Sequence, residues 1–345
     1  MKITVKPFGK LGEKLFVLEN DHGTILELSN YGGRVVRWLV KDQKQELTNI
    51  VLGFADSADY RKAGAYFGAT IGRVAGRLAN GKFPQGDKVS QLNQNEGKNT
   101  LHGGAASFET KTWQAELAES PTALTVTFTY QSPDGENGFP GNLLVVVRHT
   151  LTNQNEWIID YEGKTDQQTL FNPTNHVYFN LNKRQTKSVG SHYLYLASQE
   201  YLVIDEESLP TGEIRSVQGT SFDFTGEEGR LIQSSFDSQA QQNRLVDGID
   251  HPFILSGQRN GYKGILSEPD TGIKIGMKTT APAVVLYTTN IDEERLPINP
   301  EAVGKHTGIT LETQILPDVF SHPKFGSILL EKNQLFRSQT SYTVL

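Results

Sequence analysis

Residues 122–130 read TALTVTFTY, and from Leu124 onward apolar and polar side chains alternate strictly. A period of two, rich in threonine, valine and aromatic residues, is typical of a strand with one buried face. Residues 143–151 (LLVVVRHTL) and 157–161 (WIIDY) are also strand-like, and the turn-forming TNQN at 152–155 separates them. These runs predict three β-strands, the last two joined as a hairpin.

The same strand pattern continues along the rest of the chain. Further strands are predicted at 24–40, on both sides of Gly32-Gly33, at 263–266 and 272–278 as a hairpin, and in 327–345. Two short segments, 57–62 and 238–245, predict helices of about two turns each. We therefore expect an all-β protein, with residues 1–345 forming one large single-domain β-sandwich, because no linker or composition shift marks a boundary. A division into two domains is the alternative.

The composition excludes several classes of protein. The 33 Lys and Arg against 39 Asp and Glu give a formal net charge of −6. This acidic balance argues against a nucleic-acid-binding protein, which needs an excess of positive charge to bind phosphates. Cysteine is absent, which removes disulfide scaffolds, thiol catalysis and thiolate metal sites. No signal peptide and no apolar run approaching about 18 residues is visible. We expect a cytoplasmic protein that does not enter a membrane.

The common cofactor and metal motifs fail. Residues 76–82 (GRLANGK) nearly spell a phosphate-binding loop, but Phe83 stands where a magnesium-binding Ser or Thr belongs. The eight histidines show no H-E-x-x-H or other close ligand spacing, and no G-x-S-x-G nucleophile motif occurs. We expect neither a metal nor a cofactor.

Two histidine segments look too specific for packing alone. In NTLHGG at 99–104, two glycines after His102 permit a tight loop in which the imidazole approaches a ligand. In NPTNHVYFNL at 172–181, strand geometry places His176, Tyr178 and Asn180 on one face, which suits a polyhydroxylated ligand. The alternatives are a surface turn and a solvated sheet face.

Two acidic residues stand out in the second half of the chain. In GITLETQI at 308–315, Glu312 shares a face with Thr310 and Gln314, whose polar side chains can orient it; a solvated glutamate is the alternative. Asp250, before His-Pro, is either a turn residue or an acceptor for sugar hydroxyls.

Taken together, six motifs in order resemble the aldose 1-epimerase, or galactose mutarotase, family. They are GRVAGR at 72–77, TLHGG at 100–104, DGENGFPG at 134–141, NHVYFNL at 175–181, DHPF at 250–253 and LETQ at 311–314. The likeness runs from NYGG at 30–33 to the last strands. It implies a β-supersandwich with an open carbohydrate cleft. It also implies an isomerase that interconverts the α and β anomers of free aldohexoses, such as galactose and glucose, without a cofactor.

The resemblance also implies a role for each site residue. Glu312 would be the general base on the anomeric hydroxyl, His176 the general acid at the ring oxygen, and His102 a hydrogen-bonding group near that oxygen. Arg77 and Asp250 would bind sugar hydroxyls, with Tyr178 and Gly76 lining the site.

Two departures leave the preferred sugar open among galactose, glucose, maltose and hexose 6-phosphates. Val285 stands where some relatives carry a sugar-binding Gln, and Gly76 where some carry Asn. The oligomeric state is also open, as is whether His102 acts as an acid or only positions the sugar. The alternatives to an epimerase are a non-catalytic sugar-binding protein on the same fold and a glycoside hydrolase, which needs two carboxylates.

Overall fold

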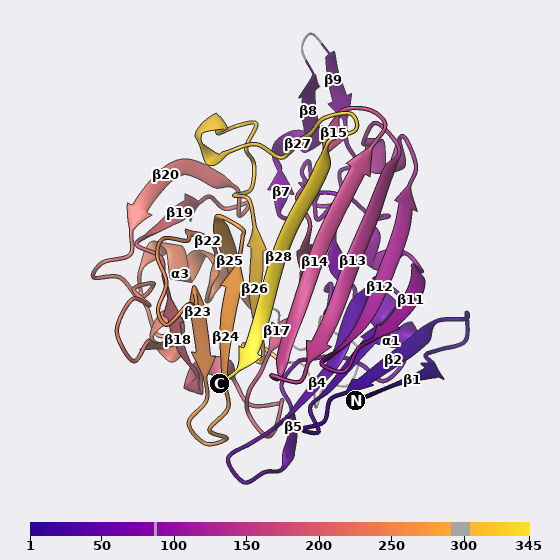
Figure 1. Cartoon of the computed structure of the whole chain (residues 1–345). Coiled ribbons are helices and arrows are strands. Elements are labelled where there is room, and N and C mark those ends of the chain that lie inside the picture. The colour runs from indigo at the N-terminus through magenta and orange to yellow at the C-terminus, as the bar shows by residue number, and fades with distance from the viewer. Residues whose placement is uncertain (86–87, 291–303) are drawn as a thin grey trace.

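The largest sheet is built around the alternating runs in the middle of the chain. The computed structural model describes residues 1–85, 88–290 and 304–345. The runs form β12 (Ala123–Ser132), β13 (Leu143–Thr152) and β14 (Glu156–Thr165), which are adjacent and antiparallel in a nine-stranded sheet (Figure 1). Leu124, Val126 and Phe128 are almost fully buried, as the alternation predicts.

In the nine-stranded sheet, the spatial order of the strands follows the sequence from β11 to β14 and departs from it after β14. That order is β11-β12-β13-β14-β28-β24-β23-β18-β21. The six further members are β11 (Gln114–Glu119), β28 (Leu335–Val344), β24 (Lys274–Thr279), β23 (Gly264–Ser267), β18 (Tyr193–Leu196) and β21 (Arg230–Leu231). The predicted hairpin is confirmed as the antiparallel pair β23 and β24. The carboxyl-terminal strand β28 lies between β14 and β24 and so joins the two halves of the sheet.

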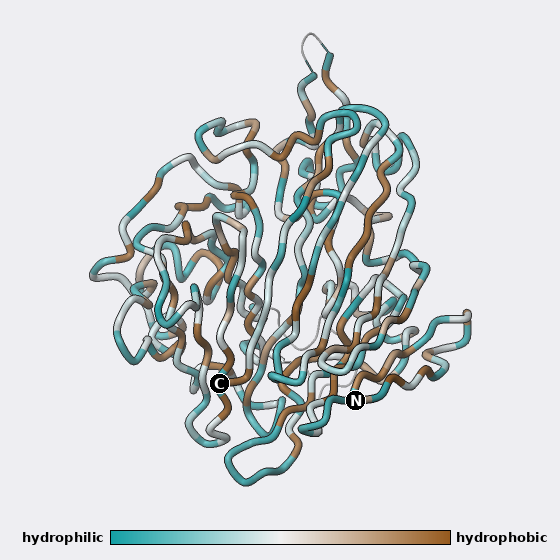
Figure 2. The backbone as a smooth tube through the Cα atoms, in the orientation of Figure 1, coloured by the Kyte–Doolittle hydropathy of each residue, from teal (hydrophilic) through white to brown (hydrophobic). Residues whose placement is uncertain are grey.

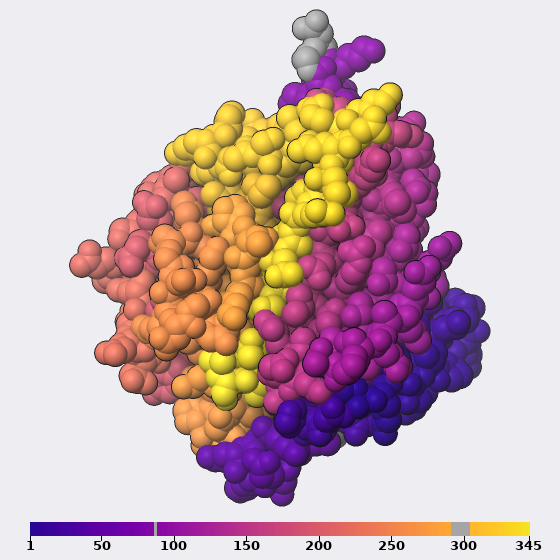
Figure 3. All heavy atoms as spheres, viewed as in Figure 1, coloured from indigo at the N-terminus to yellow at the C-terminus, as the bar shows by residue number. Residues whose placement is uncertain are grey.

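A six-stranded sheet carries most of the polar motifs. Its order is β17 (Tyr178–Phe179), β26 (Ile309–Gln314), β25 (Ala283–Thr288), β22 (Asp250–Ile254), β19 (Glu200–Ile204) and β20 (Pro210–Ser216). In Figure 1 the nine-stranded sheet lies in front of it. The first strands form a five-stranded sheet of β1 (Lys2–Pro7), β2 (Lys14–Glu19), β3 (Ile25–Ser29), β4 (Arg34–Lys41) and β5 (Leu47–Asn49), coloured indigo in Figure 3.

The three sheets share one apolar core, which gives a β-sandwich. The ring of Trp38 in β4 meets the ring of Trp157 in β14 edge-on, with centroids 5.6 Å apart. The ring centroids of Phe179 in β17 and Tyr342 in β28 are 5.0 Å apart. Brown and teal alternate along many strands in Figure 2, as expected of strands with one face in this core.

The remaining elements are short. Two-stranded pairs are β6 (Thr70–Ile71) with β16 (Thr174–Asn175), β7 (Arg77–Leu78) with β10 (Thr100–Leu101), β8 (Lys82–Gln85) with β9 (Lys88–Gln91), and β15 (Thr169–Leu170) with β27 (Leu329–Leu330). The α-helices in the described part of the chain are α1 (Ser57–Ala63), α2 (Gln233–Phe236) and α3 (Gln241–Val246). None of the described helices combines the length and the apolar character needed to cross a membrane.

Of the two predicted helices, one was placed correctly and the other began too early. Helix α1 is confirmed, with the Asp56 side chain accepting from the Ala58 N–H as its cap. Helix α3 begins at Gln241 instead of residue 238. The Ser238 hydroxyl accepts a hydrogen bond from the Ala240 N–H, and this local contact favours a turn over a helix.

Arg73 is a buried arginine whose hydrogen bonds hold two loops together. Its side chain is 2% exposed and donates to the Ser132 hydroxyl and to the backbone carbonyls of Pro140 and Gly141. An arginine this deeply buried is stable only when its donors are satisfied. The 72–77 motif is therefore held against the 134–141 loop, and the next residues of the motif lead into the site.

Candidate active site

A pocket of about 250 Å³ lies over the six-stranded sheet and is walled by loops from the first third of the chain. All seven site residues expected from the sequence line it, which are Gly76, Arg77, His102, His176, Tyr178, Asp250 and Glu312. They come from positions up to 236 residues apart, since Gly76 and Glu312 both contribute. The fold therefore brings together motifs that are remote in sequence.

Glu312 and His176 form a close pair at the base of the pocket. The Glu312 Oε1 lies 3.3 Å from the His176 Nε2, and the Thr310 hydroxyl donates to the same oxygen at 3.2 Å. Burial raises the pKa of Glu312 to about 8, and the Asp250 charge adds to the rise. Burial lowers the pKa of His176 to about 3. Near neutral pH the pair therefore holds one titratable proton, which resides on Glu312 and lies close enough to the His176 Nε2 to be transferred to it.

His102 is fixed by two hydrogen bonds to one glycine. The backbone N–H of Gly76 donates to the His102 Nδ1 at 3.2 Å, and the His102 N–H donates to the Gly76 carbonyl at 3.1 Å. Since Nδ1 accepts, the proton of the neutral ring sits on Nε2. Burial, followed by the nearby His176 and Arg77, keeps the pKa of His102 well below its ordinary value. His102 is thus a neutral hydrogen-bond donor.

The loop that carries His102 is as tight as its two glycines predict. His102 has φ 51°, Gly103 φ 88° and Gly104 φ 95°. A Cβ on Gly103 would lie 2.1 Å from the Gly72 carbonyl oxygen, so only glycine fits there. The predicted tight loop is confirmed.

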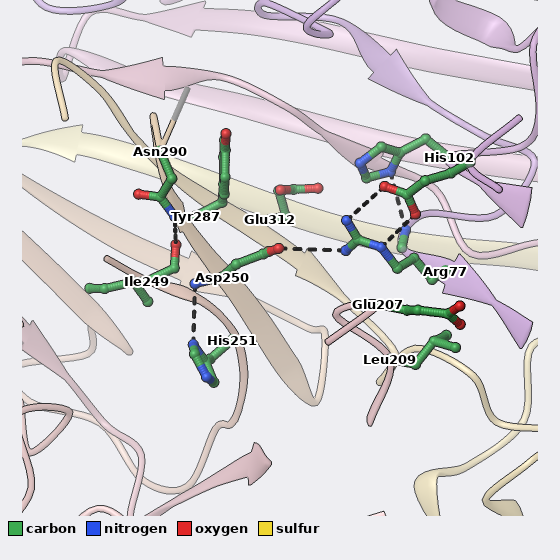
Figure 4. A network of polar contacts seen from close by, with 12 residues as sticks. Arg77, His102, Glu207, Leu209, Ile249, Asp250, His251, Tyr287, Asn290 and Glu312 are labelled. Carbon is green, nitrogen blue, oxygen red and sulfur yellow. Dashed lines mark hydrogen bonds and ion pairs between the residues drawn. The ribbon is translucent and has the colours of Figure 1, made fainter. Parts of the chain in front are cut away.

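Arg77 stands between two carboxylates on the pocket wall. Its Nε and Nη2 donate to Glu96 at 2.7 and 2.9 Å, and its Nη1 lies 3.6 Å from the Asp250 Oδ2 (Figure 4). Burial alone would lower the pKa of Arg77, but Asp250 and Glu96 raise it instead. Burial raises the pKa of Asp250, and Arg77 opposes that rise. The arrangement fixes a cation and a carboxylate side by side, a combination suited to sugar hydroxyls.

Tyrosine rings complete the walls. The Tyr66 ring meets the His102 ring edge-on at 4.7 Å between centroids. Tyr178 lines the pocket with its ring, while its hydroxyl donates to the Ala65 carbonyl at 3.0 Å. The expectation that Asn180 continues this polar face is wrong. Its amide donates to backbone carbonyls, including that of Thr307 at 2.7 Å, so the side chain is buried among backbone groups and does not line the pocket; β17 ends one residue earlier, at Phe179.

Comparison with known proteins agrees with the motifs. The family model for aldose 1-epimerase matches residues 14–343. The galactose mutarotase of Bos taurus is 34% identical over 338 residues, which are 97% of this chain and 94% of that protein. The chain belongs to the aldose 1-epimerase family. The aldose 1-epimerase of Escherichia coli K12 is 33% identical over 333 residues, or 95% of this chain and 94% of that protein.

The solved structures support the same family. The galactose 1-epimerase from Lactobacillus acidophilus NCFM superposes with a TM-score of 0.88 at 30% identity, covering 100% of this chain and 99% of that one. The resemblance expected from six motifs and the β-sandwich fold are thereby confirmed. Aldose 1-epimerases are isomerases, and the expected class of enzyme is confirmed with the family.

Sequence reasoning missed several wall residues of this aldose 1-epimerase fold. Tyr287 lines the pocket two positions after Val285, so the period of two could have found it; Gln314 was placed on the face of Glu312 but was not assigned to the site. Glu96, which binds Arg77, lies in a loop with no pattern to mark it. The alternative that Glu312 is a solvated strand residue is wrong, since its side chain is 3% exposed.

His102, His176 and Glu312 also form a cluster in which a metal ion could be considered. Among the described residues, His102, His176 and Glu312 present ligand atoms that all lie within 4.8 Å of one another. The Gly76 N–H occupies the Nδ1 lone pair of His102, and the other ring nitrogen then carries hydrogen. Neither nitrogen of His102 offers a free lone pair, so the arrangement fits proton transfer better than metal binding.

Proposed function

We propose that the protein is an aldose 1-epimerase that opens and recloses the ring of a free aldohexose. The observation that supports this most directly is the buried Glu312–His176 pair, 3.3 Å apart and sharing one proton, in a pocket lined with sugar-binding side chain types. Ring opening of a hemiacetal needs a proton taken from the anomeric hydroxyl and one delivered to the ring oxygen. The pair supplies both functions.

In the free protein the two pKa values place the titratable proton on Glu312, and the reaction begins once this proton has passed to the His176 Nε2, 3.3 Å away, which leaves the negative charge on Glu312. The Glu312 carboxylate removes the hydrogen of the anomeric hydroxyl, while the His176 imidazolium protonates the ring oxygen and the C1–O5 bond breaks. Rotation about C1–C2 presents the other face of the aldehyde, and the same two groups close the ring in reverse. Each acid or base of this kind contributes on the order of 10²- to 10⁴-fold.

His102 and the Arg77–Asp250 pair hold the sugar in this scheme. The Nε2–H of the neutral His102 ring donates a hydrogen bond near the ring oxygen of the sugar and is not transferred. The neutral state of the ring supports a positioning role for His102 over a role as an acid. Arg77 donates to hydroxyls and Asp250 accepts from them. Tyr178 and Gly76 complete the wall.

The charges around the pocket favour a neutral sugar over a hexose 6-phosphate. Arg77 is the single lysine or arginine among the described lining residues, and Glu96 and Asp250 already engage it. The phosphate of such a sugar would place two negative charges beside these carboxylates, and no unpaired lysine or arginine among the described lining residues would compensate them. We also propose one domain over residues 1–345, which the apolar core shared by the three sheets supports. We further propose a cytoplasmic enzyme that binds no nucleic acid, which the absence of cysteine and the acidic net charge support.

Polarimetry tests the proposal. Freshly dissolved α-D-galactose and α-D-glucose should reach their equilibrium rotation much faster with protein than without it. The matched control is Glu312→Gln prepared in the same way, which detects any mutarotase carried over from the expression host. Equal rates for the wild-type protein, this variant and the buffer would refute the proposal. Release of glucose from maltose would instead indicate a hydrolase.

A further inference from the structure

One buried amide in the pocket wall lacks the partners that a buried polar group requires. Gln314, at the end of β26, is 2% exposed, and its Oε1 has no hydrogen-bond partner among the residues that the structure describes. Its Nε2 donates only to the Ile315 carbonyl, at 3.3 Å. An unsatisfied buried polar group costs about 1–3 kcal/mol, so its presence needs an explanation.

The position of Gln314 is that of a site residue. It lines the pocket, and it shares a strand face with Glu312 two positions earlier. The strand rise places the two residues about 6.6 Å apart along β26. The residues paired with them on β25 are Val285, opposite Glu312, and Ala283, opposite Gln314, and neither side chain is polar. Gln314 is therefore the amide that β25 and β26 offer at this end of the pocket.

A glycine makes room for this amide beside Arg77. A Cβ built on Gly76 would lie 3.2 Å from the Gln314 Nε2 and 3.0 Å from the Pro317 Cβ. Any larger side chain at Gly76 would press on the amide. The bare backbone leaves the end of Gln314 free to turn about its last torsion, which is broad for an sp³–sp² bond. The amide thus lies next to the hydroxyl-binding Arg77 and one strand repeat from the proton-transfer pair.

We propose that Gln314 is a specificity-determining residue that hydrogen bonds a hydroxyl at the end of the sugar remote from C1. The inference rests on the proposed function, because the pocket must hold an aldose with C1 at Glu312. A hydroxyl donates to Oε1 or accepts from Nε2, so the contact forms whichever way the amide faces. The hydroxyls that lie far enough from C1 are those on C3, C4 and C6.

The test compares galactose with its 3-deoxy, 4-deoxy and 6-deoxy forms in polarimetry. The variant is Gln314→Met, which keeps the length of the side chain and removes the amide. We expect wild-type kcat/KM to fall about three- to tenfold for the one deoxy sugar that lacks the bound hydroxyl. Gln314→Met should show the same fall on galactose and no further fall on that deoxy sugar. The loss should lie in KM, since the contact is equal in the ground and transition states.

A matched control separates this role from a structural one. Thr313→Val changes the neighbouring residue, whose hydroxyl bonds to Thr340 on the other face of β26. It should change kcat/KM by the same factor for all four sugars. The thermal stability of Gln314→Met without sugar should equal or exceed that of the wild type, because an unsatisfied amide is removed.

Equal factors for all four sugars with Gln314→Met, or no change with any, would overturn the inference while leaving the proposed function intact. A wild-type protein without activity on galactose or glucose would overturn both.

Discussion

Replacing the proposed catalytic base should inactivate the enzyme and stabilise the fold at the same time. Glu312 is buried, and its pKa is raised from 4.5 to about 8, chiefly by burial. The unfolded chain loses this proton near pH 4.5, whereas the folded chain keeps it up to about pH 8. Between these values the unfolded state binds fewer protons than the folded state, and stability falls as the pH rises. Glu312→Gln removes this loss, since an amide does not titrate.

The magnitude follows from the width of that window. Stability falls by about 1.4 kcal/mol for each pH unit above 4.5, which gives a loss of about 3.5 kcal/mol at pH 7 and about 0.7 kcal/mol at pH 5. For 345 residues the entropy of unfolding is about 0.7 kcal/mol/K. Glu312→Gln should therefore raise Tm by about 5 °C at pH 7 and by about 1 °C at pH 5.

Differential scanning calorimetry at the two pH values measures the stability, and polarimetry on the same samples measures the activity. The control is Glu116→Gln on the exposed side of β11, which should leave both unchanged. We expect the rate of Glu312→Gln to fall by about 10²- to 10⁴-fold. An equal or lower Tm than wild type at pH 7 would refute the account of the buried carboxyl. Retained activity would refute its role as the base.

The remaining predictions concern the same pocket. The kcat/KM should be flat from about pH 5 to pH 7 and fall above about pH 8, where the Glu312–His176 pair loses its proton; an unchanged rate at pH 10 would contradict the shared proton. His176→Gln should lower kcat by about 10²- to 10⁴-fold with an unchanged circular dichroism spectrum, and a near-normal kcat would exclude it as the acid. Gly103→Ala should lower the free energy of unfolding by about 1–3 kcal/mol in urea and reduce kcat, because its Cβ would strike the Gly72 carbonyl; wild-type stability would show that the loop relaxes. Val285→Gln should change the ratio of galactose to glucose rates, and an unchanged ratio would show that this wall does not contact the sugar.

The fold could be predicted from the sequence because its periodicity is strong and local. Residues 122–161 give β12, β13 and β14 nearly as predicted, since alternation and turn residues act within a few positions. The helix at α3 was placed three residues early, because a side-chain contact from Ser238 decided its start. The order of strands, with β28 between β14 and β24, depends on long-range packing that no local pattern reports.

The candidate site was predictable where a motif had a physical reason to be there. The glycines after His102 required a tight loop, and Glu312 shared a face with Thr310, which now orients it. Glu96 could not be found, because its contact with Arg77 is made by a loop that only the folded chain brings near. The place of Asn180 was wrong because its side chain is buried among backbone groups.

The wide spacing of the pocket residues along the chain has a kinetic consequence. The tryptophans at 38, 113 and 157 all belong to the first half of the sequence, where Trp38 contacts Trp157 and Trp113 contacts Phe108, whereas Glu312 joins the pocket only when β26 pairs with β17 and β25. Contacts between such distant segments form slowly, because a long chain must close first. During refolding from urea, tryptophan fluorescence should therefore recover before sugar binding does. A sugar added during refolding would bind only molecules in which β26 has paired with its neighbours. The amount of sugar bound would therefore measure the fraction of molecules that have reached the native topology.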